Sequence, residues 1–390
     1  MRIDLESLDA FDAHLASGGS LAGVFVQSVD LTGRSTDLRS ADVTGAVFLG
    51  CALRPADASH LARRGALIFP RLPDLPFDPY RPELYTPDEL YDHLADGYSA
   101  TTDAAIFAWQ SAQLRPGGLA ADLAAALHDH AIIEALQQTL AEVDLSRVVG
   151  IMGGHAEPRG SGPYRSCAQL AHRLADEGHV VLSGGGPGAM EAANLGASFT
   201  GTDAELQAAI DELATGAPWS TDITGWARAA QEVIHRYQCH RLSLGIPTWF
   251  YGHEPPNLFA TRIAKFFTNA LREDVLLRMC RGGLIYLPGA AGTVQEVFQA
   301  VTPNYYAAAS DPVAPLVLVG AEYWTEVLPV WPLLRSLANG RRMADAIRLV
   351  DSTEEAIAAL KTPIVPTTAR PPAVVPLSAA SPAAPPPARD

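Results

Sequence analysis

Three apolar segments of this chain each run into a glycine-rich turn and then into a helical pattern. They are RVVGIMGG (147–154), HVVLSGGGPGAMEAANLGA (179–197) and YLPGAAGTVQEVFQ (286–299). Short strands that are apolar throughout and alternate with helices indicate a parallel sheet, because the strands of such a sheet are buried on both faces. We therefore expect an α/β fold with a doubly wound, Rossmann-like parallel sheet and helices on both faces.

The three turns define the expected ligand site. In a doubly wound sheet they lie together at the carboxyl ends of the strands, where ligands of such folds bind. Glycine lets backbone N–H groups approach an anion, and the following helix adds partial positive charge. GGGPGA lacks the acidic residue of a dinucleotide fingerprint and GAAGT lacks the lysine of a P-loop, so neither NAD nor ATP is indicated. A compact mononucleotide fits the pattern better.

The composition of the chain predicts its organisation. We expect an N-terminal region over 1–118 and a Rossmann-like domain over 119–360 with an insertion at about 199–241. The Pro/Ala-rich residues 361–390 are expected to form a disordered tail, because they have too little apolar surface to offset the entropy of ordering.

The N-terminal region carries a weak repeat. Between Ser35 and Ser59 the apolar residues Leu38, Val43, Phe48 and Leu53 recur every five positions. This period indicates either a few degenerate pentapeptide repeats, with one inward side chain per short β rung, or ordinary short strands and turns. The segment FPRLPDLPFDPYRPELYTP (69–87) follows, and its prolines predict an extended or turning chain.

The charge balance argues against several classes of partner. Asp and Glu number 43 against 28 Lys and Arg, which gives a net charge of -15, whereas nucleic acid or an anionic membrane requires a basic surface. No apolar run approaches the length of a membrane span, and the four cysteines form no CxxC pair. The histidines show no metal-ligand spacing. We expect a cytoplasmic protein without a metal site that binds a small anionic molecule.

The third turn has two interpretations from spacing alone. Thr293 and Glu296 have the Thr-x-x-Glu spacing of a helix capping box, in which the glutamate returns a hydrogen bond to the threonine backbone. Glu296 also lies off the apolar stripe of the predicted helix, in the turn that is expected to bind a phosphate. Glu296 is therefore either a capping residue or a candidate catalytic carboxylate.

Four motifs in one order carry a resemblance to a known family. PGAAGTVQE (288–296) resembles the PGGxGTxxE signature of the cytokinin-activating, LOG-type phosphoribohydrolases, which are often described as lysine-decarboxylase-like. GGH (153–155), GPGAMEA (186–192) and EPPN (254–257) resemble motifs of the bacterial pyrimidine/purine nucleotide 5′-monophosphate nucleosidases of that superfamily. The resemblance covers residues 147 to about 320.

The resemblance implies an enzyme that hydrolyses nucleoside 5′-monophosphates to free base and ribose 5-phosphate. It implies a catalytic pair of Glu296 and Arg272, with Arg278 as the other candidate for the arginine. The expected phosphate-binding residues are Gly289, Ala290, Ala291, Gly292 and Thr293. The expected nucleotide-binding residues are Gly153, Gly154, His155, Gly185, Gly186, Met190, Glu191 and Asn257. For His155, Met190 and Glu191, local hydrogen bonding, helix packing and charge complementarity to the helix are alternatives. The resemblance further implies no cofactor, and a homo-oligomer of two or more copies.

Two rival functions remain open. The same pocket could bind a nucleotide or a molybdopterin-type cofactor without turnover. Two departures from the family pattern motivate this alternative: Ala290 replaces the second glycine of the signature, and Arg272 lies about one residue further from Pro288 than the family spacing suggests. A pyridoxal-phosphate-dependent lysine decarboxylase would need a Schiff-base lysine. Only Lys265 is available for that role within the domain.

Overall fold

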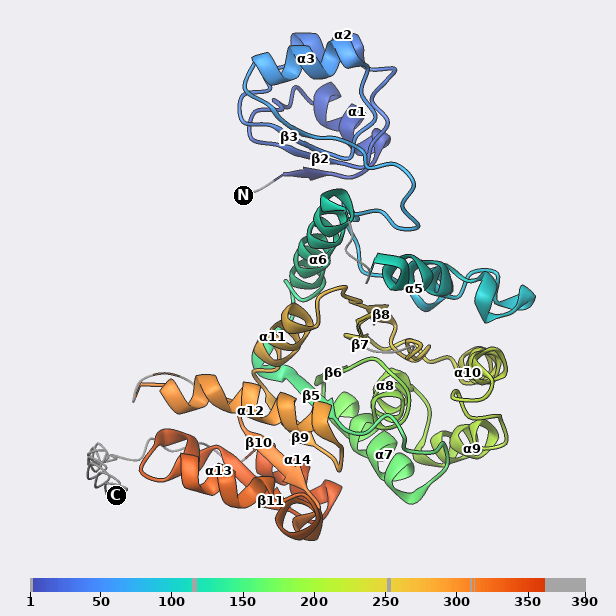
Figure 1. Cartoon of the computed structure of the whole chain (residues 1–390), viewed down its shortest axis with the longest axis vertical. Helices are drawn as coiled ribbons and strands as arrows, with labels where there is room; N and C mark the ends of the chain where they lie inside the picture. Colours follow the sequence, from blue (N-terminus) through green and yellow to red (C-terminus); the bar gives the residue numbers. More distant parts are fainter. Residues whose placement is uncertain (1–2, 114–117, 251–253, 309–310, 312, 362–390) are drawn as a thin grey trace, which may run out of the picture.

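The structure is a computed structural model that describes residues 3–113, 118–250, 254–308, 311 and 313–361. In these residues the chain forms two parallel sheets, one of four strands and one of seven. Figure 1 shows the smaller sheet and its helices at one end of the molecule, beyond α6 (Leu119–Thr139). The predicted disordered tail lies, except for Lys361, outside the described residues.

The N-terminal unit repeats a strand followed by a helix. Its strands pair in sequence order and are β1 (Asp4–Leu5), β2 (Phe25–Gln27), β3 (Val47–Leu49) and β4 (Leu67–Phe69). Its helices are α1 (Leu8–Ala16), α2 (Ser35–Ser40) and α3 (Pro55–Arg63). Phe25, Val47 and Leu67 are partners in register, so successive repeats take 22 and then 20 residues.

The prediction of pentapeptide repeats over Ser35–Ser59 is wrong. Helices α2 and α3 occupy much of this stretch. Leu38, Val43 and Phe48 are all fully buried, but they lie on a helix, in a loop and on a strand, respectively. The five-residue spacing therefore reflects burial in one shared core, which spacing alone does not assign to a type of element.

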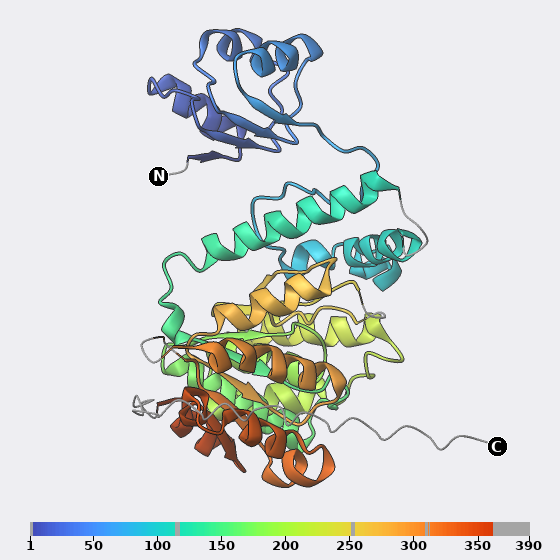
Figure 2. The same cartoon turned by 60° about the vertical axis from the view of Figure 1, so that its left-hand side comes forward.

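The proline-rich segment links the two units and is extended or turning, as predicted, until α4 (Pro87–Leu90) begins. Near its middle it bonds to the N-terminal unit, where Ser28 Oγ donates to Asp78 at 2.6 Å. At its end Tyr85 forms an antiparallel bridge with Ile263 at the edge of the larger sheet. Figure 2 shows this link passing beside α6.

The seven-stranded sheet is the predicted doubly wound, Rossmann-like fold. Its order is β11-β10-β9-β5-β6-β7-β8, and all pairs are parallel. The strands are β5 (Val148–Met152), β6 (Val180–Ser183), β7 (Ser243–Gly245), β8 (Arg262–Ile263), β9 (Gly283–Tyr286), β10 (Leu316–Val319) and β11 (Ile347–Val350). The chain begins at β5, extends to β8, and then returns to place β9 on the other side of β5. The strand order therefore reverses between β5 and β9, where folds of this type bind ligands.

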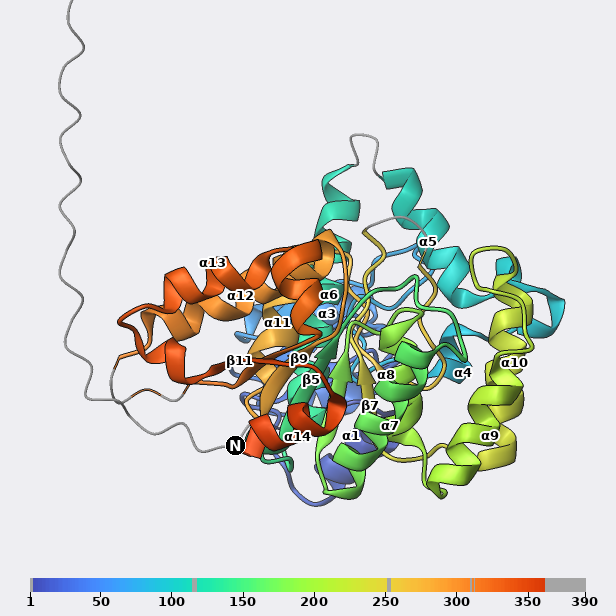
Figure 3. The ribbon, with the colours of Figure 1, turned by 90° about the horizontal axis from the view of Figure 1, so that it is seen from below.

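Helices cover both faces of this sheet. Figure 3 shows α11, α12 and α13 on one side of the strands and α7 and α14 on the other. The further α-helices of the unit are α5 (Thr102–Gln113), α7 (Gly162–Asp176), α8 (Ala189–Ser198), α9 (Asp203–Leu213), α10 (Ile223–Tyr237), α11 (Asn269–Met279), α12 (Ala291–Tyr306), α13 (Val330–Ala338) and α14 (Thr353–Lys361). The short 3-10 helices are η1 (Leu94–Asp96), η2 (Tyr98–Ala100), η3 (Leu145–Arg147) and η5 (Arg342–Asp345), and η4 (Tyr323–Val327) is a π-helix.

The segment predicted as an insertion contains α9 and α10, which follow α8 and precede β7 in the sequence. The two helices pack against each other. Both helices lie within the predicted bounds of about 199–241. Across the described ranges, no helix is both long enough and apolar enough to cross a membrane.

Candidate functional site

A cavity of about 560 Å³ opens at the carboxyl ends of β5, β6 and β9, at the point where the strand order reverses. All three predicted glycine turns contribute to its wall. The contributing glycines are Gly153, Gly154, Gly184, Gly186, Gly289 and Gly292. The topology therefore brings the third turn, which follows the other two by more than a hundred residues in the sequence, to the same place as them.

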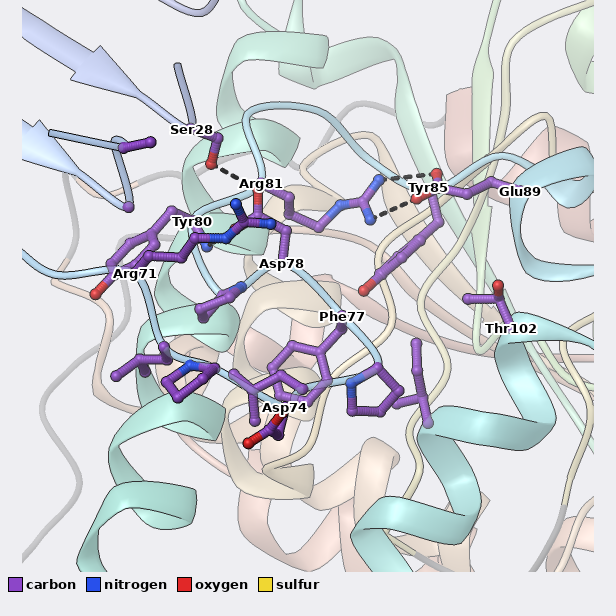
Figure 4. Close-up of a pocket in the computed structure, with 18 of the residues that line it drawn as sticks. Ser28, Arg71, Asp74, Phe77, Asp78, Tyr80, Arg81, Tyr85, Glu89 and Thr102 are labelled. Atoms are coloured by element: carbon purple, nitrogen blue, oxygen red, sulfur yellow. Dashed lines mark hydrogen bonds and ion pairs between the residues drawn. The ribbon is translucent and has the colours of Figure 1, made fainter. Parts of the chain in front are cut away.

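A larger cavity, of about 960 Å³, lies where the linker meets the N-terminal unit (Figure 4). Several of its charged groups already bond to one another: Arg81 donates to both carboxylate oxygens of Glu89, at 2.8 and 2.9 Å, and its guanidinium stacks on Tyr85. Among the described residues, none of the buried side-chain atoms without a hydrogen-bond partner belongs to this cavity. The cavity at the strand ends is therefore the candidate functional site.

Backbone contacts connect the three turns. The Gly154 N–H donates to the Pro288 carbonyl at 3.2 Å, and the Ala189 N–H donates to the Gly154 carbonyl at 3.1 Å. Gly188 has φ of +69°, and a Cβ there would come within 2.6 Å of that same carbonyl oxygen. The middle turn therefore requires glycine both for its backbone conformation and for its close approach to the first turn.

Arg272, predicted as a catalytic residue, reaches this cavity from α11. Its Nε donates to the Ile246 carbonyl at 2.7 Å, and its Nη2 lies 3.4 Å from the Gly184 carbonyl. Its Nη1 donates to Glu273 at 2.7 Å and to Glu296 at 3.2 Å. Arg278, the other candidate, is half exposed and lies 3.9 Å from Asp274 on the same helix. The geometry therefore brings Arg272, not Arg278, to Glu296.

Glu296 lies in the wall of the cavity with only 7% of its surface exposed. Burial raises the pKa of Glu296 from 4.5 to about 7; the Arg272 guanidinium opposes this rise, and the negative charge of Glu273 adds to it. A carboxylate whose pKa lies near neutrality can accept a proton from water or donate one at physiological pH. The backbone carbonyl of Glu296 accepts a hydrogen bond from the Tyr286 hydroxyl at 3.2 Å, which fixes this turn of α12 against β9.

The capping-box interpretation of Thr293 and Glu296 is wrong. Helix α12 begins at Ala291, with Ala290 as its N-cap, so Thr293 is already inside the helix. Glu296 consequently lies in the second turn, where its carboxylate faces Arg272 instead of returning to the threonine backbone. The Thr-x-x-Glu spacing alone could not reveal that the preceding alanines extend the helix toward its amino end.

The amino end of α12 forms an anion-binding geometry. No side chain among the described residues caps this helix end, and the first residues of the helix, Ala291 to Thr293, line the cavity. A Cβ on Gly289 would lie 2.2 Å from Thr293 Oγ1, so this position requires glycine. Ala290, which replaces the second glycine of the family signature, has φ of -98°, a value that any residue adopts. Tyr323 supports the turn by donating its hydroxyl to the Gly289 carbonyl at 2.7 Å.

Three predicted nucleotide-binding residues lie behind the cavity and do not line it. Glu191 is 1% exposed and forms a buried ion pair with Arg159. Asn257 is fully buried; its side chain donates to the Gly186 carbonyl at 3.1 Å, and its backbone N–H donates to the Gly185 carbonyl at 2.8 Å. Asn257 and Glu191 therefore support the site, and Gly185, with φ of +75°, shapes the turn.

His155 and Met190 line the cavity together with residues that the sequence did not single out. His155 Nδ1 lies 3.0 Å from Glu254, so the GGH and EPPN motifs meet at the cavity mouth. Glu273 is 3% exposed and bonds to Arg272. No spacing signal marks Glu273, because it is the immediate neighbour of Arg272 on α11 and only the tertiary structure brings it near Glu296.

Lys265 lies outside this cavity. Its ammonium group is buried, pairs with Asp103 at 2.7 Å and lies 4.9 Å from the centre of the Trp249 ring. This arrangement gives no support to a Schiff-base role for Lys265.

The strand order, the cavity and the buried Arg–Glu pair define a Rossmann-like domain with a candidate small-molecule site where its strand order reverses. Residues 146–203 match the family described as SLOG cluster4, and residues 227–361 match the family described as possible lysine decarboxylase. Over these two stretches the domain is therefore similar to the lysine-decarboxylase-like, LOG-type families. The two matches leave 204–226 between them, within the stretch predicted as an insertion.

The similarity to solved structures is weaker than the similarity to these two families. The molybdenum cofactor binding protein of the phototrophic bacterium Rippkaea orientalis is 17% identical, with a TM-score of 0.34, over 55% of this chain and 94% of that one. The molybdenum cofactor carrier protein of Chlamydomonas reinhardtii is also 17% identical, with a TM-score of 0.34, over 55% of this chain and 95% of that one. No curated protein matches the sequence. At this level the likenesses do not indicate which ligand this chain binds.

Proposed function

We propose that this domain hydrolyses the N-glycosidic bond of nucleoside 5′-monophosphates to free base and ribose 5-phosphate. The observation that carries the proposal is the buried Glu296–Arg272 pair, with its contact of 3.2 Å, in the same cavity as the uncapped amino end of α12. The cavity volume of about 560 Å³ lies within the range of small-molecule sites.

The phosphate is assigned to the turn from Gly289 to Thr293. The backbone N–H groups at the start of α12 supply hydrogen-bond donors and partial positive charge, so this turn needs no lysine. His155 and Met190 line the same cavity and are assigned to the side of the ribose and base.

Glu296 is assigned as the general base. The C1′–N bond breaks through an oxocarbenium-like state, in which a nearby carboxylate stabilises the developing positive charge. A water molecule forms the new O–C1′ bond, Glu296 takes one of its protons, and the departing base nitrogen receives a proton from solvent. Arg272 orients Glu296 through its charge-assisted contact.

A base-release assay with AMP, GMP, CMP and UMP tests this proposal. Wild-type protein is expected to release free base from at least one of them, and E296Q is expected to reduce kcat by about 100-fold or more, because the amide cannot accept the proton. E326Q changes an exposed glutamate on η4, outside the cavity, and serves as the matched control. Base release by E296Q at the wild-type rate would remove Glu296 from the reaction.

The same assay distinguishes the non-catalytic alternative. If wild-type protein binds these nucleotides in calorimetry but releases no base from any of them, a nucleotide or cofactor carrier replaces the hydrolase. Assembly of several copies and cytoplasmic location remain predictions.

A further inference from the structure

Glu273 is a buried carboxylate in the cavity wall that the proposed reaction does not yet use. Only 3% of its surface is exposed. Its Oε1 accepts from Arg272 Nη1 at 2.7 Å and lies 3.4 Å from the Asn269 side-chain nitrogen. Its Oε2 is buried and has no hydrogen-bond partner among the described residues. A buried carboxylate oxygen without a hydrogen-bond partner lowers the stability of the folded protein. A role in the site would explain why Glu273 lies beside the Arg272–Glu296 pair.

Glu273 and Glu296 compete for one N–H group. Arg272 Nη1 lies 2.7 Å from Glu273 but 3.2 Å from Glu296. The shorter contact directs more of the guanidinium charge to Glu273, and Glu296 is left with the weaker contact. We propose that Glu273 is a positioning residue of the reaction proposed above: by taking the closer contact with Arg272, it leaves Glu296 free to accept a proton.

The charged groups around Glu296 support this role. On α11 these are Arg272, which favours its ionised form, and Glu273, which opposes it. On β9 the hydroxyl of Tyr286 bonds to the backbone carbonyl of Glu296, not to its carboxylate. At the cavity mouth His155 and Glu254 pair with each other. Glu273 is therefore the negative group placed to offset the effect of Arg272.

Replacing Glu273 by glutamine should lower the pKa of Glu296. In E273Q the Arg272 guanidinium pairs with one carboxylate, that of Glu296, instead of two. The pKa of Glu296 should therefore fall by about one unit. Carboxyl carbon NMR of 13C-glutamate-labelled protein measures this directly, with the Glu296 signal assigned by its loss in E296Q. This titration needs no turnover, so it tests the role of Glu273 even if the proposed hydrolysis fails in the base-release assay.

In active protein, the acid limb of kcat/KM should shift to lower pH by the same amount in E273Q. D274N is the matched control, because Asp274 lies next on the same helix but is exposed and pairs only loosely with Arg278, at 3.9 Å. D274N should leave the Glu296 midpoint unchanged. A Glu296 midpoint in E273Q equal to that of the wild type overturns the proposal.

E273D keeps the inference testable if E273Q does not fold. The aspartate retains the charge but withdraws it from Arg272 by about one methylene, roughly 1.5 Å. The Glu296 midpoint should then fall by a smaller amount than in E273Q. A midpoint that stays at the wild-type value in E273D, with E273Q unfolded, also overturns the proposal.

Discussion

The proton affinity of Glu296 depends on its burial and on two neighbours. Burial raises its pKa to about 7, against the opposing charge of Arg272 and with the help of Glu273. Between about pH 4.5 and pH 7 the folded protein therefore binds more protons at Glu296 than the unfolded chain does. Because of this difference, the free energy of unfolding decreases as pH rises through this range. Above about pH 7 the protein bears the full cost of burying the ionised Glu296.

E296Q should therefore stabilise the protein at alkaline pH. Glutamine has no charge to bury, so the free energy of unfolding should rise by about 1–3 kcal/mol at about pH 8.5 and by less at about pH 6. Urea unfolding at the two pH values measures the difference. E326Q, at an exposed site, should show no such pH dependence, and a gain in E296Q that is no larger at the higher pH would contradict the pKa shift.

At the scale of elements, α6 positions the helix that carries Arg272. Helix α11 begins after Thr268, whose side chain makes no capping hydrogen bond. Asp129 of α6 anchors the two residues just before the helix: its two carboxylate oxygens accept from the N–H groups of Phe267 and Thr268, both at 2.8 Å. Arg272 lies one turn further along α11, so these two hydrogen bonds fix the position from which the turn that carries the catalytic candidate starts.

D129N should weaken both stability and activity. The amide presents N–H atoms where a carboxylate oxygen accepted a hydrogen bond, which should cost about 1–3 kcal/mol of unfolding free energy. Since Asp129 also sets the position of α11, kcat/KM for base release should fall by about tenfold or more. Chemical denaturation and steady-state kinetics measure the two effects.

T202A provides the comparison for D129N. Thr202 is part of a capping box at α9, away from the cavity, and its loss should cost about 1 kcal/mol without changing kcat/KM. If D129N and T202A affect kcat/KM equally, the contact of Asp129 with the residues before α11 has no special role at the site.

At the scale of the whole molecule, the two units have separate hydrophobic cores. The core of the N-terminal unit includes Phe11, Leu38 and Phe48, whereas Phe77 of the linker packs against the core of the larger unit. All glycine turns and the Arg–Glu pair belong to the larger unit. The site therefore requires no side chain from the N-terminal repeats.

A chain that lacks residues 1–73 should keep the site intact. It retains Phe77 and the Tyr85 bridge to the larger sheet, so it should fold and release base within about twofold of the full-length rate. Calorimetry of the full-length protein should correspondingly resolve two thermal transitions, of which only one persists in the shorter chain. Failure of the shorter chain to fold would show that the two units form one cooperative structure.

Much of the site was predictable from local sequence. Each glycine turn follows a buried strand, and the apolar run with its glycines specifies both the strand end and the conformation of the turn. Parallel strands then place these turns at one sheet edge, so the cavity itself was predictable from the fold class. The assignment of Arg272 to a contact with Glu296 came from the family resemblance, and the 3.2 Å contact agrees with it.

What the sequence determined by itself was the alternation of buried strands, glycine turns and helices, because local spacing records which residues are buried. The tertiary structure alone decided which charges meet: Glu191 pairs with Arg159, and Glu273 shares Arg272 with Glu296. It also decided that the five-residue period of the N-terminal unit belongs to strand–helix repeats. The physical reason is that the spacing of apolar residues indicates which positions are buried. The partner of a buried charge depends instead on which side chains the fold places next to it.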